Sequence, residues 1–171
     1  SNLTVLAIVG NSLTGSIPPS LGRLSKLSLL YLAENSLSGK IPGELGDCKS
    51  LTELLLKNNR LEGEIPNELG SLSKLQSFQL FNNFLTGEIP LSVWKIQSLE
   101  HIIVYGNNLT GQLPQELTEL KNLKNISLFN NQFSGTIPQG LGLNSSLVLI
   151  ELTNNKFSGE IPPHLCSGKQ L

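Results

Sequence analysis

The chain of 171 residues has no methionine, two cysteines, two histidines and a single tryptophan. The chain has twelve basic and thirteen acidic residues, so there is no excess positive charge for binding nucleic acid. No run approaches the roughly 18 apolar residues that a membrane-spanning helix needs, so we expect no membrane contact by this segment. The N-terminus also lacks a charged region followed by an apolar run, so no signal peptide is expected.

What the chain has instead is a repeat of 24 residues. An apolar-Pro pair recurs seven times without a shifted residue, from Ile17-Pro18 to Ile161-Pro162. An Asn precedes each pair by six positions, and a Gly follows each Asn by four. These Asn residues are Asn11, Asn35, Asn59, Asn83, Asn107, Asn131 and Asn155. The repeat predicts a single domain over residues 1–171, built from seven similar units.

Each repeat predicts one coil of a solenoid. Leu54 and Leu56 are spaced by two, the period of a short strand with one buried face. Farther on, Asn, Gly and Pro mark turns, and a second extended piece leads to a compact helical or 3₁₀ return. Because one coil cannot bury its own apolar face, we expect successive strands to form a parallel sheet, about 4.8 Å apart, over a continuous core.

The recurring polar and turn residues have predicted structural roles. Asn59 ends its strand, where its inward amide can bond backbone groups that the bend leaves unpaired, and its repetition predicts a ladder. Gly63 suits a tight bend, and Pro66 stops the preceding extended piece. Neither a polar nor a cysteine-paired cap flanks the repeats, which predicts an uncapped interior piece of a longer solenoid.

Strand side chains alternate, so those beside the buried pair are predicted to face the open, concave side. Two positions before the ladder Asn, consecutive coils carry Phe81, Tyr105 and Phe129, which predicts an aromatic column about 10 Å long. An exposed apolar patch with a polar rim is typical of a binding site. The remaining candidate ligand-binding residues are Tyr31, Leu55, Lys57, Gln79, His101, Ile103, Asn125 and Ser127. Stacking that only stabilises the sheet is the alternative explanation.

Other aromatic and reactive residues are expected to be structural. Phe78, Phe133 and Phe157 take buried repeat positions, and Trp94 falls in a helical return where packing is expected. Cys48 and Cys166 lie nearly five coils apart, roughly 20 Å at strand spacing, which is too far for a disulfide. His101 and His164 fall on different faces, so no shared metal is expected.

The sequence does not predict an enzyme. It lacks Gly-x-Ser-x-Gly, His-Glu-x-x-His and Gly-rich phosphate-loop motifs, so we expect neither catalytic residues nor a cofactor. Four Asn-x-Ser/Thr sequons instead favour a secretory route and predict glycosylation. They begin at Asn2, Asn108, Asn125 and Asn144.

The repeat LxxLxxLxLxxNxLxGxIPxxLGxL resembles the plant-type leucine-rich repeat over essentially all 171 residues. The resemblance implies an α/β right-handed solenoid, with a parallel sheet on the concave face and short helical returns on the convex face. The runs Leu-Phe-Asn-Asn-Phe-Leu-Thr-Gly-Glu-Ile-Pro and Val-Tyr-Gly-Asn-Asn-Leu-Thr-Gly, with Trp94-Lys95, most resemble plant receptor kinases for elicitor (damage-signal) peptides.

This resemblance implies the extracellular part of a plasma-membrane receptor with a cytoplasmic Ser/Thr kinase domain outside the segment. Such a receptor would bind an extended peptide on its concave surface, recruit a co-receptor kinase ectodomain and signal in innate immunity. A secreted inhibitor of polygalacturonase is the alternative, since it uses the same repeat to bind a folded enzyme. An ice-binding solenoid is a third possibility, but its regular row of short polar side chains is only partly matched here.

Overall fold

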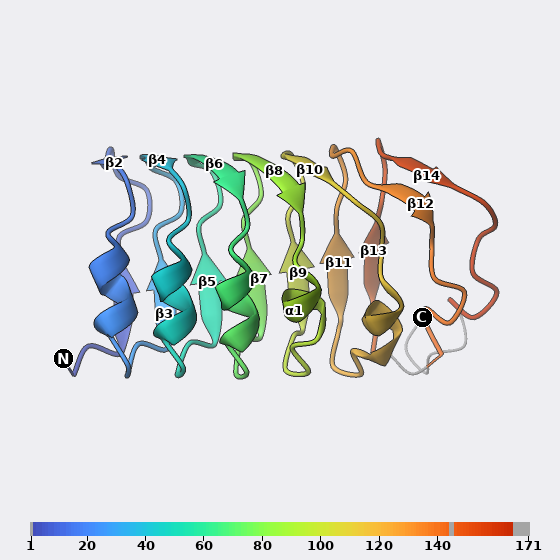
Figure 1. Ribbon diagram of the computed structural model, residues 1–171, viewed down its shortest axis with the longest axis horizontal. Coiled ribbons are helices and arrows are strands. Elements are labelled where there is room, and N and C mark those ends of the chain that lie inside the picture. The colour runs from blue at the N-terminus through green and yellow to red at the C-terminus, as the bar shows by residue number, and fades with distance from the viewer. Residues whose placement is uncertain (1, 144–145, 166–171) are drawn as a thin grey trace.

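The computed structural model describes residues 2–143 and 146–165. Similar coils lie side by side along the long axis of the molecule, in the order of the sequence (Figure 1). Each coil runs from a strand of one parallel sheet, through a turn, to a second extended segment and a return. The predicted solenoid is therefore confirmed.

The first sheet contains one three-residue strand from each coil, and every neighbouring pair is parallel. Partners are 24 residues apart, as in Val5 with Leu29 and Glu53 with Ser77. In spatial order the strands are β1 (Val5–Ala7), β3 (Leu29–Tyr31), β5 (Glu53–Leu55), β7 (Ser77–Gln79), β9 (His101–Ile103), β11 (Asn125–Ser127) and β13 (Leu149–Glu151).

The second extended segments pair as well, which the sequence did not predict. Five of them form another parallel sheet: β10 (Asn108–Thr110), β8 (Phe84–Glu88), β6 (Arg60–Glu64), β4 (Ser36–Gly39) and β2 (Thr14–Gly15). The pair β12 (Ser134–Thr136) and β14 (Lys156–Ser158) follows at the C-terminal end (Figure 1). Their pairing satisfies backbone groups that an isolated extended piece would leave to solvent.

Short helical returns cover the side of the solenoid that faces the viewer in Figure 1, opposite the first sheet. They are η1 (Pro19–Arg23), η2 (Gly43–Asp47), η3 (Asn67–Ser71), α1 (Leu91–Trp94) and η4 (Gln115–Glu119). A proline with extended backbone precedes or opens each return, as Pro66 does with φ −63° and ψ 135°. The fixed φ of proline ends the extended segment and starts the helical turn.

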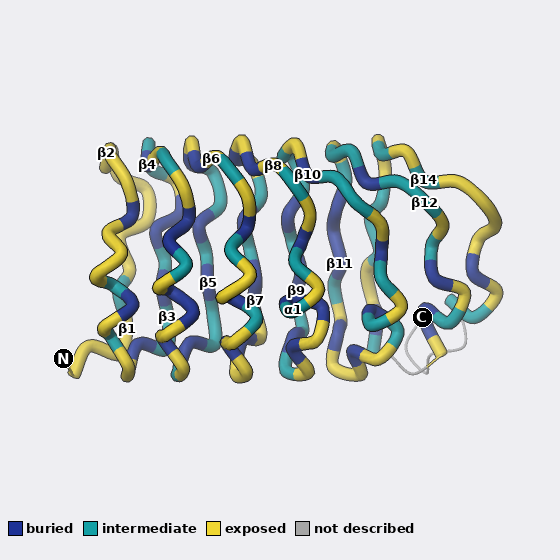
Figure 2. The backbone as a smooth tube through the Cα atoms, viewed as in Figure 1, coloured by how far each residue is buried: buried dark blue, intermediate teal, exposed yellow. Residues whose placement is uncertain are grey.

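Apolar side chains from all coils meet in one continuous core. Figure 2 shows the buried residues recurring from coil to coil along the solenoid. Leu54, Phe78 and Cys48 are fully buried, and Trp94 is 2% exposed. Phe133 is buried as predicted, whereas Phe157 is half-buried against the core. Cys48 belongs to the core as expected, and Cys166 lies outside the described residues.

The predicted asparagine ladder is present. The side chain of Asn59 is 8% exposed and accepts a hydrogen bond from the Leu37 N–H of the preceding coil at 3.0 Å. Its Nδ2 donates to the carbonyls of Leu32 and Leu56 at 2.9 and 3.1 Å. Repetition of these bonds ties each coil to the one before it, which holds the concave strands in register.

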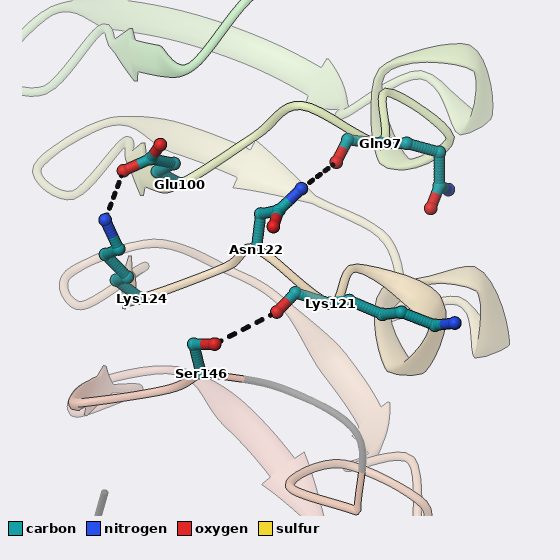
Figure 3. A network of polar contacts seen from close by, with 6 residues as sticks. All are labelled: Gln97, Glu100, Lys121, Asn122, Lys124 and Ser146. Carbon is teal, nitrogen blue, oxygen red and sulfur yellow. Dashed lines mark hydrogen bonds and ion pairs between the residues drawn. The ribbon is translucent and has the colours of Figure 1, made fainter.

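A second ladder, which the sequence did not predict, joins the turns that lead into the strands of the first sheet. Asn122 Nδ2 donates to the Gln97 carbonyl at 3.0 Å, and Ser146 Oγ donates to the Lys121 carbonyl at 3.2 Å (Figure 3). Beside them, Lys124 pairs with Glu100 at 2.6 Å, and this hydrogen bond lowers the pKa of the Glu100 carboxyl. The first sheet is thus fixed at both ends of its strands.

Candidate binding surface on the concave sheet

Three aromatic side chains form a stacked column just past the ends of β7, β9 and β11. The ring centroids of Phe81 and Tyr105 are 4.3 Å apart with planes 16° from parallel. Those of Tyr105 and Phe129 are 4.1 Å apart at 11°. The backbone hydrogen bonds Asn82 N to Tyr105 O and Gly106 N to Phe129 O hold the three coils in register. The predicted aromatic column is therefore present, and all three residues are half-buried.

Stacking decides which parts of these rings a partner can reach. The faces between neighbouring rings cover one another, and the Lys57 ammonium lies 5.2 Å from the Phe81 centroid as a cation–π contact. A ligand would therefore meet the ring edges and the Lys57 side chain. Burial and the nearby Glu151 carboxylate raise the pKa of the Tyr105 phenol, so this ring is neutral at physiological pH.

Tyr31 and Leu55 continue the surface toward the N-terminal coils. The Tyr31 hydroxyl donates to Glu53 Oε2 at 2.7 Å, and this bond raises the pKa of Tyr31 to about 12. Glu53 was not among the predicted site residues, although its place in β5 puts it on the same face. The repeat spacing could have predicted this contact, since Tyr31 and Glu53 are 22 residues apart and lie on neighbouring strands.

The polar rim differs from the prediction at one residue. Gln79, His101, Ile103 and Asn125 are half-buried on the first sheet. The expectation that Ser127 lies exposed at the rim is wrong, because its side chain is 1% exposed and its hydroxyl donates to Glu151 Oε2 at 2.8 Å.

Ser127 therefore holds Glu151 in place and offers no free hydroxyl to a ligand. Within β7, two strands away from β11, Gln79 Nε2 donates to the hydroxyl of Ser77, which is also buried, at 3.0 Å. The short polar side chains of the first sheet thus lie beneath the longer ones, which form the accessible rim.

Two hollows lie on the convex side, away from the aromatic column. Their volumes are about 490 and 430 Å³, and Glu44 and Asp47 line both. They open between the helical returns η1, η2 and η3, and none of the predicted site residues lines them. The predicted site residues instead lie on or just past successive strands of the first sheet, an elongated arrangement that suits an extended partner.

The sequons differ in accessibility. Asn2 and Asn108 are exposed, whereas Asn125 is half-buried within β11 on the concave sheet, and Asn144 lies outside the described residues. Asn108 Oδ1 accepts a bond from Gln132 at 3.3 Å. Glycosylation of the four stays a prediction, and a sugar on Asn125 would stand on the same sheet as the aromatic column.

Residues 2–143 and 146–165 contain no helix that is both long and apolar enough to cross a bilayer. Within the same residues, no three His, Cys, Asp or Glu side chains gather in a group that could hold a metal ion. Trp94 is core, Phe84 is 63% exposed, and His164 is half-buried near the C-terminal end of the described chain.

Stacked coils, with a parallel sheet on one side and short helical returns on the other, define a solenoid protein. The repeat identifies it further. The chain belongs to the leucine-rich-repeat family, whose models match residues 1–61, 98–120, 122–144 and 146–167. No curated protein sequence matches the chain significantly.

Solved structures of plant receptors are similar to this chain over nearly its whole length. The PEPR1–AtPEP1 complex is 56% identical over 96% of this chain, with a TM-score of 0.95. The Arabidopsis receptor kinase HAESA with an IDA peptide hormone is 40% identical over 96%, with a TM-score of 0.92. HAESA has also been solved with IDA and the co-receptor SERK1.

A plant ice-binding protein is more distant, at 26% identity over 94% of this chain and a TM-score of 0.71. This chain covers 59% of that protein's length. It spans only about a quarter of the length of the receptor ectodomains, 23% for PEPR1 and 28% for HAESA.

Proposed function

We propose that this chain is a ligand-binding part of a plant receptor kinase ectodomain, and that it binds an extended endogenous peptide along its concave sheet. The aromatic column of Phe81, Tyr105 and Phe129 carries the proposal. Three stacked rings with their edges exposed supply rigid apolar contact area at low entropic cost, and Lys57 and His101 beside them can fix the direction of a polar chain.

The similarity to receptors supports the rest of the proposal. The complexes of PEPR1 with AtPEP1 and of HAESA with IDA both pair a similar solenoid with a peptide. We infer that these seven coils are a segment of a longer extracellular solenoid, which reaches the cell surface by the secretory pathway and precedes a cytoplasmic Ser/Thr kinase domain. By analogy with HAESA, a co-receptor ectodomain joins the bound peptide. From the resemblance to receptors for elicitor peptides, we infer that the signal serves defence against damage.

Calorimetric titration of the AtPEP1 peptide into the complete extracellular domain tests this function. We expect Phe81→Ala and Phe129→Ala each to weaken binding by about 1–3 kcal/mol, in the range of buried aromatic contacts in interfaces. Tyr105→Ala should weaken it most, because Tyr105 stacks on both neighbours and its loss frees two rings.

Val9→Ala is the matched control, because Val9 occupies the same repeat position four coils before Tyr105 and outside the column. It should leave binding unchanged, and circular dichroism should show that each variant is folded. Binding that none of the three aromatic substitutions alters would remove the site while leaving the receptor. Absence of binding to the unmodified domain would refute the proposed function and lead to an assay of polygalacturonase inhibition.

A further inference from the structure

A row of carboxamide side chains runs beside the aromatic column, one residue farther along each coil. Asn82 Nδ2 donates to Asn58 Oδ1 at 2.8 Å, and Asn154 Nδ2 donates to Asn130 Oδ1 at 2.8 Å. In each pair the side chain of the later coil donates to the one in the coil before it. Between the two pairs the row is interrupted, because the corresponding residue is Gly106.

The backbone does not require a glycine at this position. Gly106 has a φ of 63°, and the asparagines at the same position in other coils have φ values of 53–55°. Gly106 also keeps the usual backbone bonds, with its N–H to Phe129 O at 3.0 Å and its carbonyl accepting from Asn83 N at 3.2 Å. Since Asn tolerates this left-handed conformation, only the side chain is missing.

The missing side chain interrupts the row between Asn82 and Asn130, and we call this interruption the carboxamide gap. Asn82 Oδ1 lies 2.4 Å from the place a Cβ on Gly106 would take, so it points at the gap. Within the described part of the chain, no hydrogen bond reaches Asn82 Oδ1 and none leaves Asn130 Nδ2. The two asparagines are two coils apart, roughly 9.6 Å at strand spacing. One further carboxamide would complete the row.

A hollow of about 190 Å³ adjoins Gly106 on the side of the asparagine ladder. Asn83, Phe84, Asn107 and Asn108 line it together with Gly106, whereas Asn82 and Asn130 do not. Phe84 is 63% exposed and gives the hollow an apolar wall. Gly106 directly follows Tyr105, the middle ring of the column, so the gap lies about 3.8 Å along the backbone from the candidate binding surface.

We propose that the carboxamide gap is a subsite for one amide group of the peptide that lies on the aromatic column. The amide N–H donates to Asn82 Oδ1, and its carbonyl accepts from Asn130 Nδ2, in the direction that the row already follows. An Asn or Gln side chain and a backbone amide share this chemistry. The inference rests on the proposed function, since the same peptide must lie across Tyr105.

Gly106→Asn tests the subsite, because it places the chain's own carboxamide in the gap. The new Cβ requires Asn82 Oδ1, which is the end of a flexible side chain, to move aside. Once Asn82 accepts from the new side chain as Asn58 accepts from Asn82, the variant should be at least as stable as the unmodified protein in thermal denaturation. It should weaken binding of AtPEP1 to the complete extracellular domain at least tenfold. Gly10→Asn is the matched control, because Gly10 has a φ of 69° at the same repeat position, with open space around it.

Peptide variants identify the amide. Each Asn or Gln of AtPEP1 is replaced by Ala, and each backbone amide by an ester, in separate peptides. One of these replacements should weaken binding of the peptide to the unmodified domain. The same replacement should not further weaken binding of the peptide to the Gly106→Asn variant. Unchanged binding by Gly106→Asn, with binding still lost on Tyr105→Ala, would overturn the subsite and leave the proposed function intact.

A Gly106→Asn variant that is less stable than the unmodified protein would overturn the geometry of the row, independently of any peptide. Failure of AtPEP1 to bind the unmodified domain would overturn both proposals. A loss of binding that Gly10→Asn shares equally would also overturn the subsite.

Discussion

Replacing Asn83 by Ala tests whether the asparagine ladder holds the solenoid together. Asn83 is 6% exposed, and its Oδ1 accepts the Leu61 N–H of the preceding coil at 3.0 Å. Its Nδ2 donates to the carbonyls of Leu56 and Leu80 at 3.1 and 3.0 Å. The substitution removes the acceptor and the donor at once, at a side chain that is almost completely buried.

The expected cost follows from which groups keep a partner. The Leu56 and Leu80 carbonyls still accept bonds from Asn59 and Asn107, so neither is left unpaired. The Leu61 N–H loses its partner, and an unsatisfied buried donor costs about 1–3 kcal/mol. Loss of the three donated bonds, the third being to the Phe81 carbonyl at 3.4 Å, adds about 1 kcal/mol. We therefore expect the free energy of unfolding to fall by about 2–4 kcal/mol.

Asn11→Ala is the control, since Asn11 is exposed and, among the described residues, its side chain makes a single hydrogen bond, to the Val9 carbonyl at 3.1 Å. It should cost less than about 1 kcal/mol. Because stacked repeats can unfold in parts, denaturant unfolding is combined with hydrogen exchange, which should quicken over residues 56–85 in Asn83→Ala. Equal destabilisation by the two substitutions would refute the assigned role of the ladder.

Two other predictions concern packing and pH. Gly46→Ala should lower the melting temperature, because the added Cβ would lie 2.3 Å from the Glu68 carbonyl oxygen. In the same thermal denaturation series Gly140→Ala should be tolerated, because the nearest atom to its added Cβ is 3.6 Å away. The hydrogen bond to Glu53 raises the pKa of Tyr31 to about 12, so the stability that it contributes is complete below pH 10 and is lost as pH rises toward 12. The stability difference between the unmodified protein and Tyr31→Phe should disappear over that range, and a difference that persists at pH 12 would contradict this assignment.

The sequence by itself determined the solenoid, because the same 24-residue spacing places the same chemical group at the same point of every coil. Leu54 and Leu56 must share a buried face, and Asn59 must stand where the strand bends, whatever the neighbouring residues are. Repetition also determined the aromatic column, since residues 24 apart become neighbours across parallel strands. These features depend on period alone.

Only the tertiary structure decided how side chains of unequal length share the surface. Ser127 and Gln79 both belong to the first sheet, yet the short Ser127 lies beneath Glu151 while Gln79 stays within reach of solvent. The pairing of the second extended segments, such as β8 with β10, could not be predicted from the sequence either, because these segments lack an alternating apolar pattern.

The carboxamide gap shows the same division. The sequence shows that Gly106 interrupts a row of Asn residues. The directions in which Asn82 and Asn130 point depend on hydrogen bonds with other coils, which no local pattern encodes. The period thus determined which residues are neighbours, and packing in three dimensions determined which of their atoms remain free to bind.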